Sequence, residues 1–473
     1  MKNVEKHILE RGYVTPNDAC AISDTDSHSI NNAVALAIAT GLGKVVIPRY
    51  NARSGKMQWD TDEAIILSSN LEIVLDNCYI RQTDGSMDNV FRNFDDERVR
   101  TTLEEEQHNI VIRGVGNAVL DGGNHNGLTQ KTSLKDGLPH VEKNNLIRLH
   151  NLSGFRIENL TLANQRWWAM NLLYCECGVI SDITINCKND VHNQDGIDLR
   201  HGCNNILVER IFGAAGDDVV AMTGFFNNRS SDKYAVEGKS KDIHDIIVRN
   251  VIATSAECTV VGMRCQDGVK LYNITVDSIY DSMSSATAAI KAPSYIFNFD
   301  NNSYKTPKSP YSVIRIGQDG YVNKIPCAPG DVHSIHVTNI HARTNAAVLI
   351  NVDIENSYFG NIYAENDVDR VITTRSCRDH QCYGANMRNT VFENIFYSCT
   401  DNEDSVVFDF DINQRDFALD GVTIRNAYVG EASTVINMQH LGRLTATDIY
   451  GNDVEKKITV RDGSTVILDG KKI

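Results

Sequence analysis

Proline is scarce in this sequence, with 8 residues among 473. Because proline cannot donate a hydrogen bond within a sheet, its scarcity favours long, uninterrupted strands. No run of about 18 apolar residues occurs, so we expect no membrane-spanning helix and no membrane partner. The first twenty residues also lack the apolar core of a secretory signal, which leads us to expect a cytoplasmic protein.

Basic patches are absent as well. The net charge of −15 argues against a nucleic-acid partner and would repel a polyanion at long range. The 12 cysteines are scattered, without a CxxC pair or zinc-like spacing. We therefore expect reduced, mostly buried thiols, no metal and no cofactor. The hydrophobic fraction of 42% is sufficient for a large core.

Two elements are predicted near the start of the chain. Ser29 to Gly41 has apolar residues at helical spacing, with Ser29 as a possible cap and Gly41 as a possible end. Lys44 to Pro48 follows as a strand. A helix and a strand of this kind would close the open end of a repeat protein.

A short phrase then returns along the chain. It consists of alternating apolar residues, a polar residue and a second apolar pair, as in FRIENLTL, IIVRNVIA and IHVTNIHA. Asparagine tolerates left-handed backbone geometry, so we expect the polar position to lie at bends, with its side chains bonded along a ladder. That position is occupied by Asn159, Asp182, Arg210, Asn250, Asn273, Asn339, Asn361, Asn394, Asn426 and Asp448.

The alternation predicts strands, and the spacing predicts how they stack. Close copies such as Asn339 and Asn361 are 22 residues apart, which leaves no room for crossover helices. We therefore predict an all-β protein, a right-handed parallel β-helix with parallel strands from about Asn109 to the C-terminus. An antiparallel sandwich or propeller would need frequent Asn-Gly and Asp-Gly hairpins, which the chain lacks.

The predicted organisation is a single domain over residues 1–473. Residues 1–60 form the cap region and residues 61–473 form the coils, with insertions at 225–242 and 294–330. Both insertions are polar with interleaved aromatic residues. Because insertions in repeat proteins gather on one face, we expect them to wall a cleft.

Two consecutive coils carry a group of acids. NQDGIDL contains Asn193 and Asp195, and AGDDVVAM contains Asp217 and Asp218. A residue one coil further on lies about 4.8 Å away on the same face, so the three aspartates would meet on one wall. Their repulsion would raise at least one pKa, as glycoside hydrolysis requires. A simple Asp-Gly turn and metal binding by the three acids are the alternatives.

The order NxDGxD, followed by GDD about one coil later, resembles polygalacturonase-type enzymes of glycoside hydrolase family 28. The segments NQRWWAM, TVVGM and AAIKA resemble three further family segments, and the likeness extends roughly over residues 29–292. The resemblance implies an inverting hydrolase. Asp217 would be the general acid, Asp195 and Asp218 would be the base or hold the water, and Lys291 would contact substrate.

The chain departs from the family where the family binds an acidic sugar. The family histidine corresponds to Glu257, its arginine to Ala289, and a lysine of many bacterial members to Thr223. We therefore expect a neutral glycoside beside the general acid, unless other cations restore acid binding from another direction. The candidate substrate-binding residues are Asn193, Glu257, Lys291, Trp168, Arg200, His201 and Arg264.

Two other functions stay open. One is a different carbohydrate-active β-helix enzyme, such as a lyase, an epimerase or an anhydride-forming fructotransferase, to which the extra acid Glu257 would contribute. The other is a non-catalytic carbohydrate-binding β-helix, although such a protein has no need to stack acids that repel one another. The expected partner is an oligosaccharide substrate. The oligomeric state is left open, a homo-oligomer included.

Overall fold

The computed structural model describes residues 2–188, 191, 193–224, 233–256, 258–282, 312–317, 327–343, 346–374, 385–400, 402–411 and 417–473. The chain divides into two compact units. Unit 1 comprises Met1–Gly216 with Lys233–Ser240, and unit 2 comprises Asp217–Asp232 with Lys241–Ile473. Within the described residues, no helix combines the length and the apolar character that crossing a membrane requires. The prediction of a single domain stays a prediction.

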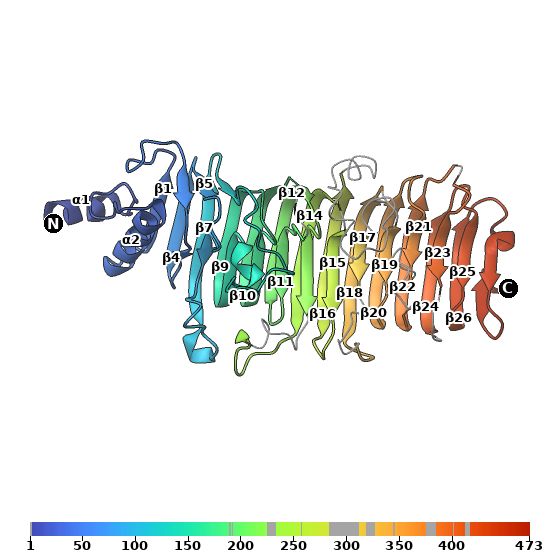
Figure 1. Ribbon diagram of the computed structural model, residues 1–473. Coiled ribbons are helices and arrows are strands. Elements are labelled where there is room, and N and C mark those ends of the chain that lie inside the picture. The colour runs from blue at the N-terminus through green and yellow to red at the C-terminus, as the bar shows by residue number, and fades with distance from the viewer. Residues whose placement is uncertain are drawn as a thin grey trace. The chain divides into compact units, whose positions relative to one another are not determined.

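Unit 1 begins with two helices, α1 (Lys2–Arg11) and α2 (Asp26–Ala39), of which α2 lies beside the first strand (Figure 1). The predicted helix exists, but it begins earlier than expected, because Thr25 rather than Ser29 is its cap. The Thr25 side chain accepts a hydrogen bond from the backbone N–H of His28. The hydroxyl of Ser29 instead donates to the Thr25 carbonyl oxygen within the first turn. The strand predicted at Lys44–Pro48 is confirmed as β1.

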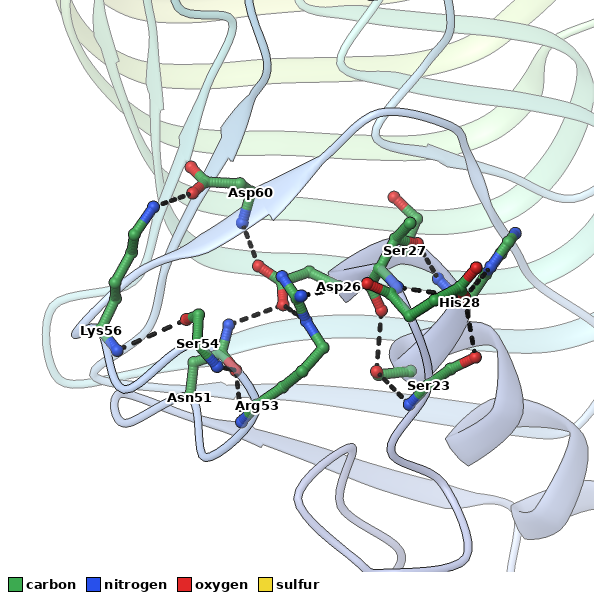
Figure 2. Close-up of polar contacts among 12 residues, drawn as sticks. Ser23, Asp26, Ser27, His28, Asn51, Arg53, Ser54, Lys56 and Asp60 are labelled. Atoms are coloured by element: carbon green, nitrogen blue, oxygen red, sulfur yellow. Dashed lines mark hydrogen bonds and ion pairs between the residues drawn. The ribbon is translucent and has the colours of Figure 1, made fainter.

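A buried carboxylate joins this helix to the loops that follow it (Figure 2). Asp26 is fully buried and accepts hydrogen bonds from Asn51 Nδ2 at 2.7 Å, Arg53 Nε at 2.6 Å and the backbone N–H of Asp60 at 2.8 Å. Charge-assisted bonds of this kind are the stronger ones in proteins. Asp26 therefore fixes the cap region to the strands that begin at β2.

The coils of unit 1 are built from parallel strands. β9 shows the principle, because its 17 residues pass through left-handed bends at Asn151 and Asn159. Its first residues pair with β6, its middle with β7 and its end with β8. The strand thus turns corners and contributes to several faces of one coil. The elements are α1 (Lys2–Arg11), α2 (Asp26–Ala39), β1 (Lys44–Pro48), β2 (Trp59–Thr61), β3 (Ile65–Ile66), β4 (Leu71–Asp76), β5 (Tyr79–Gln82), β6 (Phe91–Arg92), η1 (Leu103–Glu105), β7 (Gln107–Val115), β8 (Val119–Asp121), η2 (Val141–Asn144), β9 (Ile147–Ala163), β10 (Met170–Asn186), β11 (Ile197–Arg200) and β12 (Asn204–Ala215).

Unit 2 repeats the same plan as a stack of coils, with β14, β16, β18, β20, β22, β24 and β26 side by side (Figure 1). A second parallel stack runs from β13 through β15 and β17 to β27. The elements are β13 (Val220–Gly224), β14 (Ile243–Ser255), β15 (Thr259–Cys265), β16 (Leu271–Asp281), β17 (Ser312–Ile316), β18 (Val332–Ala342), β19 (Ala346–Ile350), β20 (Ile354–Ala364), β21 (Arg370–Thr373), β22 (Met387–Tyr397), β23 (Val406–Phe410), β24 (Ala418–Tyr428), β25 (Thr434–Met438), β26 (Leu441–Tyr450), η4 (Val454–Lys457), β27 (Ile458–Val460), β28 (Thr465–Leu468) and β29 (Lys471–Lys472).

The parallel β-helix predicted from the repeats is confirmed in both units, with two corrections. The last pair, β28 with β29, is antiparallel. The second predicted insertion, 294–330, also contains a coil strand, β17, which pairs in parallel with β15. Of the predicted insertions, residues 225–232, 294–311 and 318–326 lie outside the described residues, whereas in 233–242 the side chains of Tyr234 and Val236 are buried in a hydrophobic cluster.

Left-handed bends occur at the polar positions, as predicted. Asn159, Asn250 and Asn273 have φ values of 56°, 56° and 53°. The register corrects one assignment, because Arg249 pairs with Asp277, so that Ser278 is the equivalent of Asn250. Asn273 marks a second bend, five residues earlier on the same strand. Most long strands of unit 2 have two such bends, such as Asn389 and Asn394 in β22.

These asparagines form the expected ladder. Asn361 Nδ2 donates to Asn339 Oδ1 at 3.1 Å, Asn394 to Asn361 at 2.9 Å, and Asn426 to Asn394 at 2.7 Å. Two residues after each ladder position, an aromatic ring contacts the ring at the same position of the next coil, either stacked or edge-on. We call these six residues the aromatic column: Tyr280, His341, Tyr363, Phe396, Tyr428 and Tyr450.

Candidate functional site

Asp217 and Asp218 lie in unit 2 immediately before β13, at the point where the chain enters the stack of β13, β15 and β17. Asp218 is fully buried, and Asp217 is 8% exposed. A glycine of β15 lies against the Asp218 carboxyl group: a Cβ placed on Gly262 would lie 3.3 Å from Asp218 Cγ. The glycine therefore lets the buried carboxylate pack closely against β15.

Arg264 holds Asp218 in this position. Its Nη2 atom lies 2.7 Å from Asp218 Oδ2. Burial raises the pKa of Asp218 above its ordinary value, Arg264 lowers it, and the neighbouring Asp217 raises it again. The guanidinium of Arg264 therefore favours an ionised Asp218, against the effect of burial.

Cys258 completes this cluster in unit 2. Among the described residues, Asp217, Asp218 and Cys258 offer three potential ligand atoms within 4.8 Å of one another. The Arg264 guanidinium already donates to Cys258 Sγ at 3.0 Å, and burial followed by Asp218 raises the pKa of the Cys258 thiol. Arg264 therefore contacts two of the three members of this cluster.

The first acidic motif lies in unit 1, on the turn that leads into β11. Asn193 has a left-handed φ of 58°, and Asp195 is 2% exposed. The Asp195 carbonyl oxygen accepts from Gln165 Nε2 at 3.1 Å and from the backbone N–H of Ala169 at 2.9 Å. Gln194 Nε2 in turn donates to the Gln165 carbonyl at 2.7 Å. Two buried glutamines thus fix the backbone of the turn that carries Asp195.

Three predicted substrate-binding residues of unit 1 pack within the protein. The Trp168 ring stacks on Trp167 at 3.9 Å between centroids, and the Arg200 guanidinium lies over the Trp168 ring at 4.7 Å. His201 is fully buried and meets the Tyr174 ring edge-on at 5.3 Å. Burial lowers the pKa of Arg200. Trp168 therefore stacks on protein groups, and its expected contact with a sugar stays a prediction.

Several predicted residues are not placed. Glu257, Ala289 and Lys291 lie outside the described residues. Asp195 belongs to unit 1, whereas Asp217, Asp218 and Arg264 belong to unit 2, and the structure brings the last three together. The meeting of all three aspartates in one cleft therefore stays a prediction.

One cation near the acids was missed in the sequence. Arg315 of β17 is 4% exposed, pairs in register with Gly262 of β15, and has its Nη1 atom 3.8 Å from Cys258 Sγ. It also lowers the pKa of Asp218. The signal was available, because SVIRI contains an Arg-Ile pair on a strand pattern. SVIRI falls within the predicted insertion 294–330, and the family arginine was matched to Ala289 in AAIKA instead.

Comparisons with known proteins show what the sequence and the fold are similar to. Residues 90–239 match the family described as Glycosyl hydrolases family 28, a narrower region than the predicted likeness over 29–292. An exopolygalacturonase of Zea mays is 28% identical over 119 residues, which are 24% of this chain and 27% of the maize protein.

Solved structures show the fold. A family 28 exopolygalacturonase of Yersinia enterocolitica has a TM-score of 0.52 at 12% identity, covering 98% of this chain and 79% of its own. The A-module of a mannuronan C-5 epimerase of Azotobacter vinelandii has a TM-score of 0.52 at 12% identity, covering 97% of this chain and 98% of its own. A mutant tailspike protein of E. coli bacteriophage HK620, in complex with a pentasaccharide, has a TM-score of 0.60 at 12% identity, covering 98% of this chain and 80% of its own. The fold is a right-handed parallel β-helix of the kind that carbohydrate-active proteins use. The predicted resemblance to glycosyl hydrolases family 28 is thus confirmed, and the match to that family extends over residues 90–239.

Proposed function

We propose that this protein is a glycosidase that hydrolyses an oligosaccharide by an inverting mechanism. The observation that carries the proposal is the adjacent pair Asp217 and Asp218, buried in unit 2 with one member bound by Arg264. Both aspartates, and Asp195 of the first motif, fall inside the segment that matches family 28. Paired carboxyl groups in different environments are the requirement of acid–base glycoside hydrolysis.

The different environments of Asp217 and Asp218 suit them to different roles in catalysis. Asp217 retains some exposure, at 8%, and is the better placed of the two to reach the oxygen of a leaving sugar. It protonates that oxygen as the glycosidic bond breaks. Asp218 is fully buried against Arg264, which favours its ionised form, as a carboxylate that holds the attacking water must be. Asp195 is the second water-holding group. In an inverting enzyme the acid and base carboxyls are about 6.5–9.5 Å apart, which leaves room for that water.

The proposed substrate is neutral at the subsite beside Asp217. Thr223, which stands where many bacterial family members have a lysine, lies in register with Arg264 on the next coil. The guanidinium groups nearby have protein partners: Arg264 binds Asp218 and Cys258, and Arg315 Nε donates to the Gly317 carbonyl at 3.3 Å. Arg264 therefore needs no sugar carboxylate to balance its charge.

The test is a panel of neutral and acidic oligosaccharides assayed for released reducing sugar. We expect wild type to hydrolyse a neutral oligosaccharide, with products that gain the mass of one water. Asp217→Asn should lose most turnover, whereas Asp420→Asn, which changes an exposed acid of the same unit, should keep it. Products of unchanged total mass would indicate a lyase, an epimerase or an anhydride-forming transferase instead. Full turnover in Asp217→Asn would refute the assigned acid, and efficient hydrolysis of galacturonate oligomers would refute the neutral subsite.

A further inference from the structure

Two cysteines of unit 2 lie in direct contact. Cys265 is the last residue of β15, and Cys327 precedes the turn that leads into β18. Their Sγ atoms are 2.8 Å apart, and Cys327 Sγ also lies 2.7 Å from the Cys265 carbonyl oxygen. A disulfide has an S–S length of about 2.05 Å, so bonding would require the two sulfurs to approach by less than about 1 Å.

The backbone holds both thiols in place. On one side, the residue after Cys265 is tied to β13, because the Gln266 N–H donates to the Gly224 carbonyl at 3.1 Å. On the other side, the residue after Cys327 is tied to a turn, because the Ala328 N–H donates to Asp331 Oδ2 at 2.7 Å. The Asp331 carbonyl accepts in turn from the Leu271 N–H of β16 at 2.9 Å. The sulfurs therefore meet between two anchored segments.

The two thiols differ in access. Cys265 is 1% exposed, whereas Cys327 is half-buried and open to a small reagent. The hydrogen bond with Cys327 and burial raise the pKa of the Cys265 thiol well above its ordinary value. A reagent in solution therefore meets Cys327 first, and Cys265 reacts afterwards and slowly, because the thiolate is the reactive form.

We propose that Cys265 and Cys327 are a modification site, at which a reversible disulfide forms by exchange with a small-molecule disulfide such as oxidised glutathione. The Cys327 thiolate attacks one glutathione sulfur, a mixed disulfide forms, and one glutathione leaves as a thiolate that takes up a proton. The Cys265 thiolate then attacks the Cys327 sulfur and releases the second glutathione. Two protein thiols are oxidised, and one disulfide is reduced to two thiols.

The bond would join positions 62 residues apart in the sequence. Closing a loop of this length restricts the unfolded chain and so stabilises the folded one. It would also tether the residue that follows Arg264, which binds the buried Asp218. The oxidised protein should therefore unfold at a higher temperature than the reduced protein, with the gain reversed by dithiothreitol.

The full-length protein is incubated with oxidised glutathione, its remaining thiols are alkylated in denaturant, and its peptides are mapped by mass spectrometry. We expect one cross-linked peptide pair that contains Cys265 and Cys327, with a mass lower by two hydrogen atoms. Cross-linking should be faster at higher pH, as the second step requires. Tm should rise by several degrees in the same sample.

Cys327→Ser is the informative variant, because this half-buried position tolerates a hydroxyl better than the buried Cys265 does. It should form no cross-link and show no gain in Tm on oxidation. The matched control is Cys20→Ser, which removes an exposed thiol in unit 1 and should behave as wild type. Wild type that accumulates only a glutathione adduct at Cys327, or that pairs either cysteine with another partner, would overturn the proposal.

Discussion

Arg264 Nη2 lies 2.7 Å from a carboxylate oxygen of Asp218, a residue with no exposed surface. The same nitrogen reaches Cys258 Sγ at 3.0 Å. One guanidinium therefore contacts two of the three polar side chains of a buried cluster. Removing one partner of such a pair costs more than the pair contributes, because a charge is left in a poorly solvating place.

Arg264→Leu should destabilise the protein by about 3–5 kcal/mol at neutral pH. The loss should depend on pH. Without Arg264 the folded-state pKa of Asp218, already raised, rises further above its unfolded value, so stability is retained in acid and lost as pH rises through that folded pKa. Unfolding midpoints measured across pH should show the deficit growing from acid to neutral. Arg264→Lys, which keeps the charge, should show a smaller deficit, and a deficit equal at all pH values would contradict the role assigned to Asp218.

His150 should make unit 1 sensitive to acid. Burial lowers its pKa to about 4, and its ring packs among Phe94, Tyr174 and Tyr234. Because the folded pKa is depressed, the stability linked to this histidine is complete above the unfolded pKa and is lost as pH falls toward 4. The loss should reach about 3 kcal/mol. His150→Gln should flatten the dependence of Tm on pH over this window, whereas His7→Gln at an exposed position should not.

Asp26 should be the most sensitive position of the cap region. It is fully buried and accepts bonds from Asn51, Arg53 and the Asp60 backbone. Asp26→Ala leaves these donors without their acceptor, and we expect a loss of about 3–5 kcal/mol in chemical denaturation. Lys56→Ala removes an exposed ion pair to Asp60 from the same loop and should cost about 1 kcal/mol or less. Equal losses would show that burial does not decide the outcome.

The aromatic column should contribute stability through ring stacking. Phe396 stacks on Tyr363 at 5.1 Å, with an angle of 9° between the rings, although it is 43% exposed. Phe396→Ala should cost about 1 kcal/mol more than Phe396→Leu, which keeps an apolar side chain without the ring. Thermal unfolding of the three proteins measures the difference. If the leucine and alanine variants unfold at the same temperature, the aromatic column results from the strand register and its ring contacts do not stabilise the protein.

The fold was predictable because its signals are local and repeated. Period-2 alternation and recurrent asparagines are enough to predict parallel stacking, and Asn339 and Asn361 lie at the expected bends. The errors in the predicted bends also have a local cause. The copy around Asn273 was assigned one bend too early, because a strand with two left-handed corners offers two positions where asparagine fits. The alternation of buried and exposed residues does not show which bend is meant. Ile335 and Val337 are buried two residues apart, but the next buried residue, Ile340, comes three residues later because the bend at Asn339 shifts the alternation by one.

The site was predictable only where it is carried by a motif. Asp217 and Asp218 stand out in the sequence as an adjacent pair after glycine, and Asp195 stands out in NQDGID. The pairing of Asp218 with Arg264, and the position of Arg315 behind Cys258, depend on which strands become neighbours between coils. Loops of varying length separate those strands, so the spacing in the sequence does not reveal the pairing. The contact of Cys265 with Cys327 was hidden for the same reason.

The asparagine ladder separates the parts of the chain that can change from those that cannot. Asn339 and Asn361 are 22 residues apart and Asn361 and Asn394 are 33 apart, yet each amide bonds to the one before it. The additional residues of the longer coil lie outside the asparagine ladder, and the strands after them keep the same register. In evolution, the connections between coils could therefore be lengthened, shortened or replaced without a change in the register of the stacked strands. This gives the molecule a frame on which new recognition surfaces can evolve one loop at a time.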